Sequence, residues 1–243
     1  MNKHFTITAL IIFIAFNSKA QDSEFKANQG DVTAEFVFLG GLLDTQLGLN
    51  SNMLRFRYFI SSRTAARLGL GIASQSETVN IPDDPMSPQN YGEIRGSYTQ
   101  MGINIGLERH FEGTDRLSPY IGGDFLVAFT SVRERGTDVA PGGNYSLGSS
   151  FTRKGAILGV PGFDAPDAGN AIGFRLVGGA DFYFIRNIFI GAEFGWGLLA
   201  TNLRDLEVES TAAGAPTINI VTQRGNRSIS SSIIGNFRLG FVF

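Results

Sequence analysis

The chain has 243 residues, with 20 basic side chains, 22 acidic side chains and no cysteine. A net charge of −2 argues against nucleic-acid binding, which needs a basic surface. The missing cysteines exclude disulfides, thiolate metal ligands and a cysteine nucleophile. A mean hydropathy of +0.05 together with 21 Phe and 31 Gly is unusual for a soluble enzyme. The same composition suits a membrane barrel that has an aromatic outer face and small residues inside.

Residues 1–20 have the pattern of a secretory signal. Lys3 and His4 begin it, an apolar run follows from Thr6 to Phe16, and Ser18 to Ala20 offers a small-x-small cleavage site. The run is shorter than the roughly 20 apolar residues that a membrane-spanning helix needs. We therefore predict a signal peptide over 1–20 and one mature domain over 21–243, with 18 basic and 22 acidic residues after Lys3 and Lys19 are removed.

Period-two alternation of apolar and polar residues predicts eight strands in the mature chain. They lie near 31–39, 53–60, 65–77, 97–111, 118–134, 171–184, 188–202 and 230–243. The even number favours a bacterial single-chain barrel. The expected fold is therefore all-β, an eight-stranded antiparallel up-and-down transmembrane β-barrel, preceded by a brief polar lead-in over 21–30.

The connections between these strands alternate in length. Short ones are expected at 61–64, 112–117 and 185–187, and long ones rich in Gly, Pro, Ser, Asn and Asp at 78–96, 135–170 and 203–229, after a first loop over 40–52. Outer-membrane barrels have short periplasmic turns and longer outside loops. This asymmetry predicts that both termini are periplasmic and that the long loops lie outside the cell.

The last strand carries a second indication of the compartment. Phe237, Leu239, Phe241 and Phe243 share one parity, and Arg238 stands on the other. A terminal aromatic residue that ends an alternating strand is typical of a bacterial outer-membrane barrel. We expect this strand to be the signal that engages the barrel-assembly machinery, and the protein to be integral to the outer membrane of a Gram-negative cell.

Parity also assigns a face to each side chain. One parity holds the apolar residues expected to contact lipid: Phe36, Phe38, Leu54, Phe56, Tyr58, Leu68, Leu70, Ile72, Met101, Ile103, Ile105, Leu107, Ile121, Phe125, Val127, Phe129, Phe174, Leu176, Phe182, Ile190, Phe194, Trp196 and Leu198. The other parity holds a lumen charge network: Glu35, Arg55, Arg57, Arg67, Glu108, Asp124, Arg175, Asp181, Glu193 and Arg238. Five arginines and five carboxylates in a confined interior imply mutual pairing.

Two interpretations of these charges remain open. They are either a plug of ion pairs and bound water, or the lining of a selective channel. Eight strands enclose an interior only just wide enough for side chains to fill, which favours the plug. We therefore expect no continuous open pore.

The side chains of the mature chain include few groups that could serve in catalysis or metal binding. The mature chain has a single histidine, His110, which we expect at the periplasmic rim beside Glu108 and bonded to that carboxylate or to water. The adjacent acids Asp83 and Asp84 lack the spaced oxygen ligands of a calcium loop and are expected in a solvated turn. We predict no catalytic residue, no metal site and no cofactor.

The pattern resembles the small outer-membrane β-barrel domain family of the OmpA and OmpX type, especially porin-like versions from Bacteroidota. The segments that carry the resemblance are Leu54 to Phe59, Ala65 to Gly71, Tyr120 to Gly123 and Arg238 to Phe243. The resemblance implies a plugged interior. Full-length OmpA-like proteins add a peptidoglycan-binding domain after the barrel, and we expect no such tether because this chain ends on the expected last strand.

Three functional hypotheses follow. The first is a non-enzymatic integral barrel in contact with outer-membrane lipid, acting in envelope structure or in contact with a protein partner through its long loops, as an accessory subunit of a larger complex. The third outside loop, expected over 135–170, contains Tyr145, Phe151, Leu158 and Phe163, which favours packing against the barrel mouth, another loop or a partner. The second is a small-solute porin, and the third is a lipid-modifying enzyme that would depend on His110.

Overall fold

A computed structural model describes residues 24–38, 53–86, 89–223 and 226–243. The predicted signal peptide and the predicted loop over 40–52 lie outside these residues. The described chain contains eleven strands and none of its residues forms a helix long and apolar enough to cross a membrane. Eight of the strands form a closed antiparallel ring, so the predicted all-β eight-stranded barrel is confirmed.

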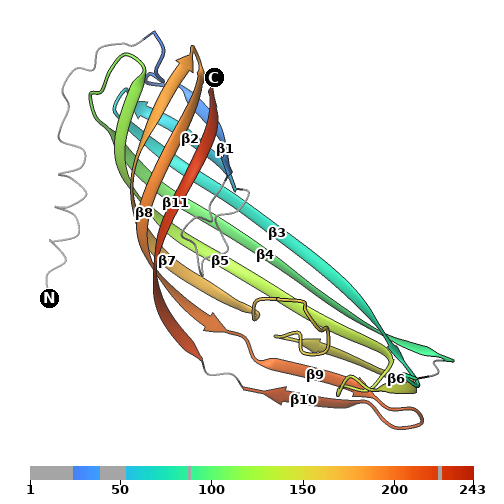
Figure 1. Cartoon of the computed structure of the whole chain (residues 1–243). Coiled ribbons are helices and arrows are strands. Elements are labelled where there is room, and N and C mark those ends of the chain that lie inside the picture. The colour runs from blue at the N-terminus through green and yellow to red at the C-terminus, as the bar shows by residue number, and fades with distance from the viewer. Residues whose placement is uncertain (1–23, 39–52, 87–88, 224–225) are drawn as a thin grey trace, which may run out of the picture.

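The ring runs in the order β1, β2, β3, β4, β5, β7, β8, β11 and closes between β1 and β11 (Figure 1). Its strands are β1 (Val32–Phe38), β2 (Met53–Ser61), β3 (Thr64–Pro82), β4 (Tyr91–His110), β5 (Leu117–Val139), β7 (Gly169–Ile185), β8 (Ile188–Leu203) and β11 (Arg227–Val242). Each of these eight strands pairs with a neighbour on both sides over at least part of its described length, which closes the ring.

The long connections predicted over 78–96, 135–170 and 203–229 contain strands, so their predicted extent is wrong. β3 and β4 stay paired as far as Pro82 and Tyr91, inside the predicted loop 78–96. Three further strands occupy the other two predicted loops: β6 (Tyr145–Lys154), β9 (Leu206–Thr211) and β10 (Ile218–Thr222). Gly, Ser and Asn residues in these segments concealed a strand pattern that exists because the segments pair with each other.

β5 pairs with different strands along its length. Its first part, Leu117 to Thr130, pairs with β7 in the ring, and its last part, from Arg133 to Val139, pairs with β6. The open sheet β3-β4-β5-β6-β9-β10 therefore leaves the barrel and projects beyond one end (Figure 1). We call this projecting part, residues 74–86, 89–99, 131–139 and 145–154 with β9 and β10, the sheet extension.

A small core fixes the sheet extension. Ile94, Val139, Phe151, Val160 and Phe163 are buried against one another, and Tyr98 packs against Phe163 with ring centroids 5.9 Å apart. The expectation that the segment 135–170 packs on something is thus resolved, since its apolar side chains cover the inner face of β4 and β5. Leu158, also expected to pack, is exposed.

The opposite end of the barrel carries the short connections. β2 and β3 are joined through Ser62 and Arg63, and β7 and β8 through Arg186 and Asn187, where Asn187 has a φ of 68°. A tight two-residue hairpin turn needs a residue with a left-handed backbone conformation, and Asn adopts that conformation more readily than most residues. Both short turns lie where they were predicted.

The same end is capped by the chain segment that precedes β1. Ala27 is buried in a cluster with Phe59, Tyr183, Phe189 and Val242, and Phe25 packs against that cluster. The prediction of a merely polar lead-in is therefore wrong for this part of 21–30. The segment covers the barrel mouth because its two apolar residues fill space that the strand ends leave open.

Candidate functional site in the barrel interior

All ten charged residues predicted for the lumen lie inside the barrel. Their exposed fractions range from 0% to 4%. They come from β1, β2, β3, β4, β5, β7, β8 and β11, so every strand of the ring contributes at least one charge: Glu35, Arg55, Arg57, Arg67, Glu108, Asp124, Arg175, Asp181, Glu193 and Arg238. We call this set the interior network.

One half of the interior network is centred on Arg57. Its Nη1 lies 2.8 Å from Glu108 Oε1 and 2.7 Å from Asp181 Oδ2, and its Nε pairs with Glu35. Arg238 contacts two of the same carboxylates, with Nη1 2.8 Å from Glu35 Oε2 and Nη2 2.5 Å from Asp181 Oδ1. Two arginines thus share two carboxylates in one compact group.

The other half is centred on Glu193. Arg55 donates to both of its carboxylate oxygens at 3.1 Å, and Arg67 Nη2 lies 2.9 Å from Oε2. Arg67 also reaches Asp124, with Nε 2.9 Å from Oδ1, and Arg175 donates to Asp124 Oδ2 at 2.5 and 3.0 Å. The planar guanidinium suits such sharing because its donors form a rigid fork.

The two halves are connected. Arg67 Nη1 lies 3.2 Å from Glu108 Oε2, and the Tyr120 hydroxyl donates to Glu193 at 2.8 Å while it accepts a bond from Arg238 at 2.5 Å. Tyr120 is part of the network although the sequence analysis did not include it among the lumen groups. Its inward parity beside Asp124 was the signal that could have found it.

Glycine gives this network the room it needs. A Cβ added at Gly191 would meet Asp181 Oδ1 at 2.6 Å and Arg238 Nη2 at 2.8 Å. These distances are too short for carbon, so any other residue at 191 would displace the ion pair. Part of the high glycine content of the chain is thus explained by large charged side chains packed in a narrow barrel.

His110 joins the network at the capped end. Its Nε2 lies 2.9 Å from Glu108 Oε1, the contact expected from the sequence, and its Nδ1 lies 2.8 Å from Ser118 Oγ. The sequence analysis missed Ser118. The three side chains form a hydrogen-bonded series, but Glu108 also faces Arg57 and Arg67. All three are buried, with Ser118 the most exposed at 6%.

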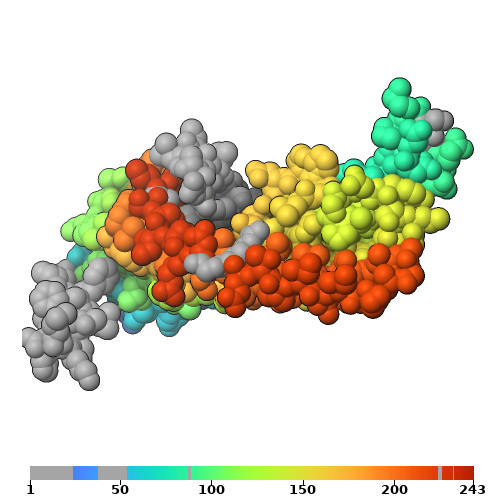
Figure 2. Space-filling model, turned by 90° about the horizontal axis from the view of Figure 1, so that it is seen from below, coloured from blue at the N-terminus to red at the C-terminus, as the bar shows by residue number. Residues whose placement is uncertain are grey.

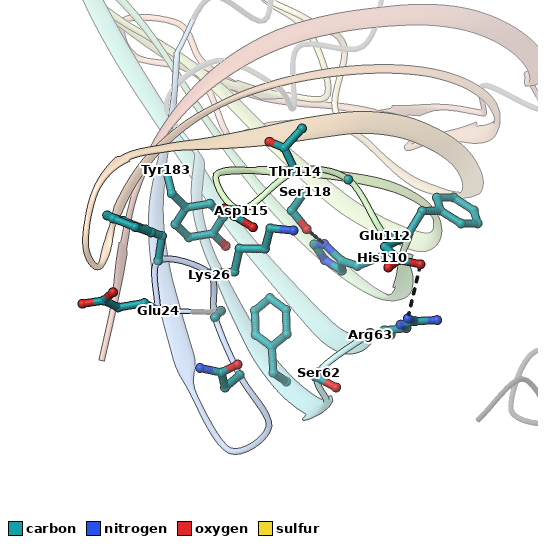
Figure 3. Close-up of a pocket in the computed structure, with 16 residues that line it drawn as sticks. Glu24, Lys26, Ser62, Arg63, His110, Glu112, Thr114, Asp115, Ser118 and Tyr183 are labelled. Carbon is teal, nitrogen blue, oxygen red and sulfur yellow. Dashed lines mark hydrogen bonds and ion pairs between the residues drawn. The ribbon is translucent and has the colours of Figure 1, made fainter. Parts of the chain in front are cut away.

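A pocket of about 270 Å³ lies outside this histidine (Figure 3). The segment before β1 forms one wall, and Lys26 points from it into the pocket between Tyr183 and His110. Burial lowers the pKa of Lys26, and the nearby carboxylates of Asp115 and Glu112 oppose that shift. Across the pocket Arg63 Nη2 lies 4.0 Å from Glu112. The lining is of mixed charge and selects neither an anion nor a cation.

Asp83 and Asp84 stand in the turn between β3 and β4. Asp83 accepts bonds from the Gln89 amide at 2.9 Å and from Asn90 Nδ2 at 3.0 Å. Bonds from Asn90 and Gln89 lower the pKa of Asp83 to about 2. The Asp83 carboxylate therefore forms its hydrogen bonds within its own turn. No group of three or more potential metal ligands occurs within the described ranges.

The outer parity of the ring is apolar. Most of the predicted lipid-facing residues are exposed large hydrophobics, among them Phe36, Ile105, Phe125, Leu176 and Phe194, and the others with a described side chain, such as Leu107 and Val127, are half-buried. The side chain of Phe38 is not among those described. On the terminal strand Phe237 and Phe243 are exposed and Leu239 and Phe241 are half-buried. We call this continuous surface the apolar belt.

Two outer membrane proteins are among the solved structures that are similar to this chain. The outer membrane protein OprG from Pseudomonas aeruginosa has 12% sequence identity and a TM-score of 0.33, over 90% of this chain and 99% of that chain. The outer membrane protein AlkL in lipid bilayers has 15% identity and a TM-score of 0.33, over 93% of this chain and 95% of that chain. No family model and no curated protein matches. Identities of this size carry no information about a site, so the role of this chain has to come from its own residues.

Proposed function

We propose that this protein is a non-enzymatic integral barrel of the outer membrane whose lumen is closed by the interior network. The apolar belt supports the membrane location, because only a closed barrel or a helix satisfies all backbone groups in lipid. The OmpA or OmpX type and a Bacteroidota source remain predictions from the resemblance. In this proposal both termini and the short turns are periplasmic, and the sheet extension lies outside the cell.

The observation that carries the proposal is the neutral, mutually paired interior. Five arginines face five carboxylates, and these groups span the ring from β1 to β11. Each charge would be costly if left alone in such a place, so the pairs hold one another in position. A solute would have to break several of these ion pairs at once to pass. A barrel closed to solutes would act in the structure of the envelope or in contact with other proteins.

The sheet extension supplies the surface for such contact. β10 pairs with β9 on one side and, among the described residues, with no strand on the other. Ile218, Ile220 and Val221 on β10 are 56% to 62% exposed. Figure 2 shows β9 and β10 on the outside of the molecule, along the flank of the extension. An exposed apolar edge strand is a template for pairing with another chain.

A photoreactive amino acid at Ile220 tests the contact role in the native outer membrane. We expect a protein adduct from position 220 and only lipid adducts from the matched position Tyr58, which lies in the apolar belt. A second variant replaces residues 205–225 with an Asn-Gly turn, which is feasible because Leu203 N already donates to Asn226 O at 3.2 Å.

This shortened barrel should insert as the full chain does and should lose the partner. Absence of any protein adduct at 220 would contradict the contact role, as would retention of the partner by the shortened barrel. The barrel-assembly machinery, which we expect to bind the terminal strand from Phe237 to Phe243 during insertion, is a separate partner that the shortened barrel keeps.

The series Ser118, His110 and Glu108 favours one second candidate, a lipid-modifying enzyme at the periplasmic rim. A hydroxyl, an imidazole and a carboxylate in sequence are the parts of a nucleophile and its base. Against it, Glu108 is already shared between two arginines, which fixes its charge. His110→Ala that leaves the lipid composition of the membrane unchanged would remove this candidate.

A further inference from the structure

Three arginines lie together on the sheet extension, on the same face as the apolar belt. Arg95 on β4 shares its parity with Met101, and Arg133 and Arg135 on β5 share theirs with Phe129. The outward face of both strands therefore changes along its length from apolar to basic. Between the two lies a band of hydroxyl side chains, which are Ser97, Thr99 and Ser131 on these strands and Ser74 and Ser76 on β3.

The register brings like charges face to face. Arg95 stands directly opposite Arg135, and Ser97 stands opposite Arg133. The three arginines are exposed and line a depression of about 270 Å³ together with Ser97. Like charges directly opposite each other on neighbouring strands destabilise a sheet. A bound anion would convert this repulsion into attraction.

The surroundings leave the charge of the three arginines uncompensated. Arg95 Nε donates to Ser76 Oγ at 3.1 Å, and no carboxylate of the described residues forms an ion pair with any of the three. The nearby cation Lys154 is already paired with Glu207 at 3.0 Å. Glu93 and Glu209 lie on the same face at the borders of the cluster. They bound the positive area without neutralising it.

Distance along the strands places the cluster at the headgroup level. Phe129 and Arg133 are four residues apart, and Met101 and Arg95 six, which is roughly 13 to 20 Å of strand at about 3.3 Å per residue. Barrel strands tilt by about 40°, so the height above the apolar belt is roughly 10 to 15 Å. Long arginine side chains can reach back towards the membrane from there.

We infer that Arg95, Arg133 and Arg135 bind the phosphate groups of outer-leaflet lipid headgroups, with phosphorylated glycolipid as the class of ligand. The inference rests on the proposed membrane location and orientation. The guanidinium fork bonds phosphate oxygens in pairs, and three forks around one depression fit a headgroup with more than one phosphate. Lipid, rather than a free anion, is the source because the depression lies on the same face as the apolar belt, separated from it only by the band of hydroxyl side chains, and acyl chains would cover that belt.

The test uses the full chain in phosphatidylcholine nanodiscs, with diphosphorylated lipid A as the probe and native mass spectrometry as the readout. The variant carries Arg95→Gln and Arg135→Gln, and the charge-matched control carries Arg186→Gln and Arg227→Gln at two exposed sites that are not clustered. We expect the variant to lose lipid A affinity about tenfold or more and the control to stay within about twofold, because the variant removes two of the three cations that face the anionic headgroup. Binding of the wild type should also weaken with added salt.

Equal retention of lipid A by the variant and the wild type would overturn the inference. Full displacement of lipid A by millimolar inorganic phosphate would also overturn it, since the site would then be one for the free anion. Failure of the wild type to insert into nanodiscs would count against the proposed function itself. Insertion without selective lipid binding would remove only this inference.

Discussion

Arg57 contacts three carboxylates in the barrel interior, so its loss would leave more unpaired charge than the loss of a surface residue. Arg57→Met keeps much of the side-chain volume but leaves Glu35, Glu108 and Asp181 with fewer ion-pair partners. We expect the free energy of unfolding to fall by about 3 to 5 kcal/mol. Arg186→Met, at an exposed turn, should change it by no more than about 0.5 kcal/mol.

Reversible urea unfolding of both variants in phospholipid vesicles would measure these differences. A loss at Arg57 no larger than the loss at Arg186 would show that the interior charges are not mutually dependent. It would also remove the basis for a rigid plug.

Gly191 offers a second residue-scale prediction. Gly191→Ala should destabilise the barrel by about 1 to 3 kcal/mol, because the added methyl group must displace Arg238 or Asp181. Gly178→Ala is the matched control, since a Cβ there would have only Tyr120 O within 4.0 Å. Equal stability of the two variants, measured by the same unfolding assay, would argue that the ion pair has space to move.

For single residues, the sequence predicts which charged side chains lie in the barrel interior but does not predict which of them form ion pairs with each other. Alternation alone assigned Arg57 and Asp181 to the same interior, because inward and outward parity is a local property of a strand. It could not pair them, since that contact joins β2 to β7 across the barrel and depends on register and closure. Ser118 was missed for the same reason, as its contact with His110 crosses between β4 and β5.

At the scale of elements, the turn between β3 and β4 makes a prediction about pH. The Asp83 carboxylate has a pKa lowered from 3.8 to about 2, so its ionised form stabilises the turn. The contribution is complete above pH 3.8 and is lost as the pH falls through about 2. Protection of the Gln89 amide from hydrogen exchange should therefore persist from pH 5 to pH 3.

Asp83→Ala should abolish that protection at every pH, whereas Asp84→Ala should preserve the Gln89 contact, because Asp84 bonds the Met86 amide instead. Protection of the Gln89 amide that fails near pH 4 would mean that Asp83 is not the group that holds it.

Element prediction succeeded where strands carry large apolar residues and failed elsewhere. The eight ring strands alternate Phe, Leu and Ile with charges or glycine, because lipid and lumen impose opposite demands on the two faces. β9 and β10 lie outside that environment and are only six and five residues long, with Glu, Ser, Thr and Asn among their few aliphatic residues. Their strand structure comes from pairing with β6 and with each other, which is a tertiary effect that composition does not show.

For the whole molecule, the barrel and the sheet extension distribute their apolar and charged side chains differently. The barrel holds its charges inside and its apolar residues outside, and the sheet extension has an ordinary core around Ile94 and Phe151. The basic cluster of Arg95, Arg133 and Arg135 stands where the two parts meet. In the proposed orientation this junction is the outer surface of the membrane. One continuous set of strands, β3 to β5, thus links the membrane to the cell exterior.

Ion conductance of the purified full chain in a planar bilayer tests the central proposal, that the interior network closes the barrel. The account predicts no steady conductance for the wild type and a measurable leak for Arg55→Ala combined with Glu193→Ala, which opens a gap while the interior stays neutral. Steady single-channel steps from the wild-type protein would contradict the account and make the barrel a solute channel.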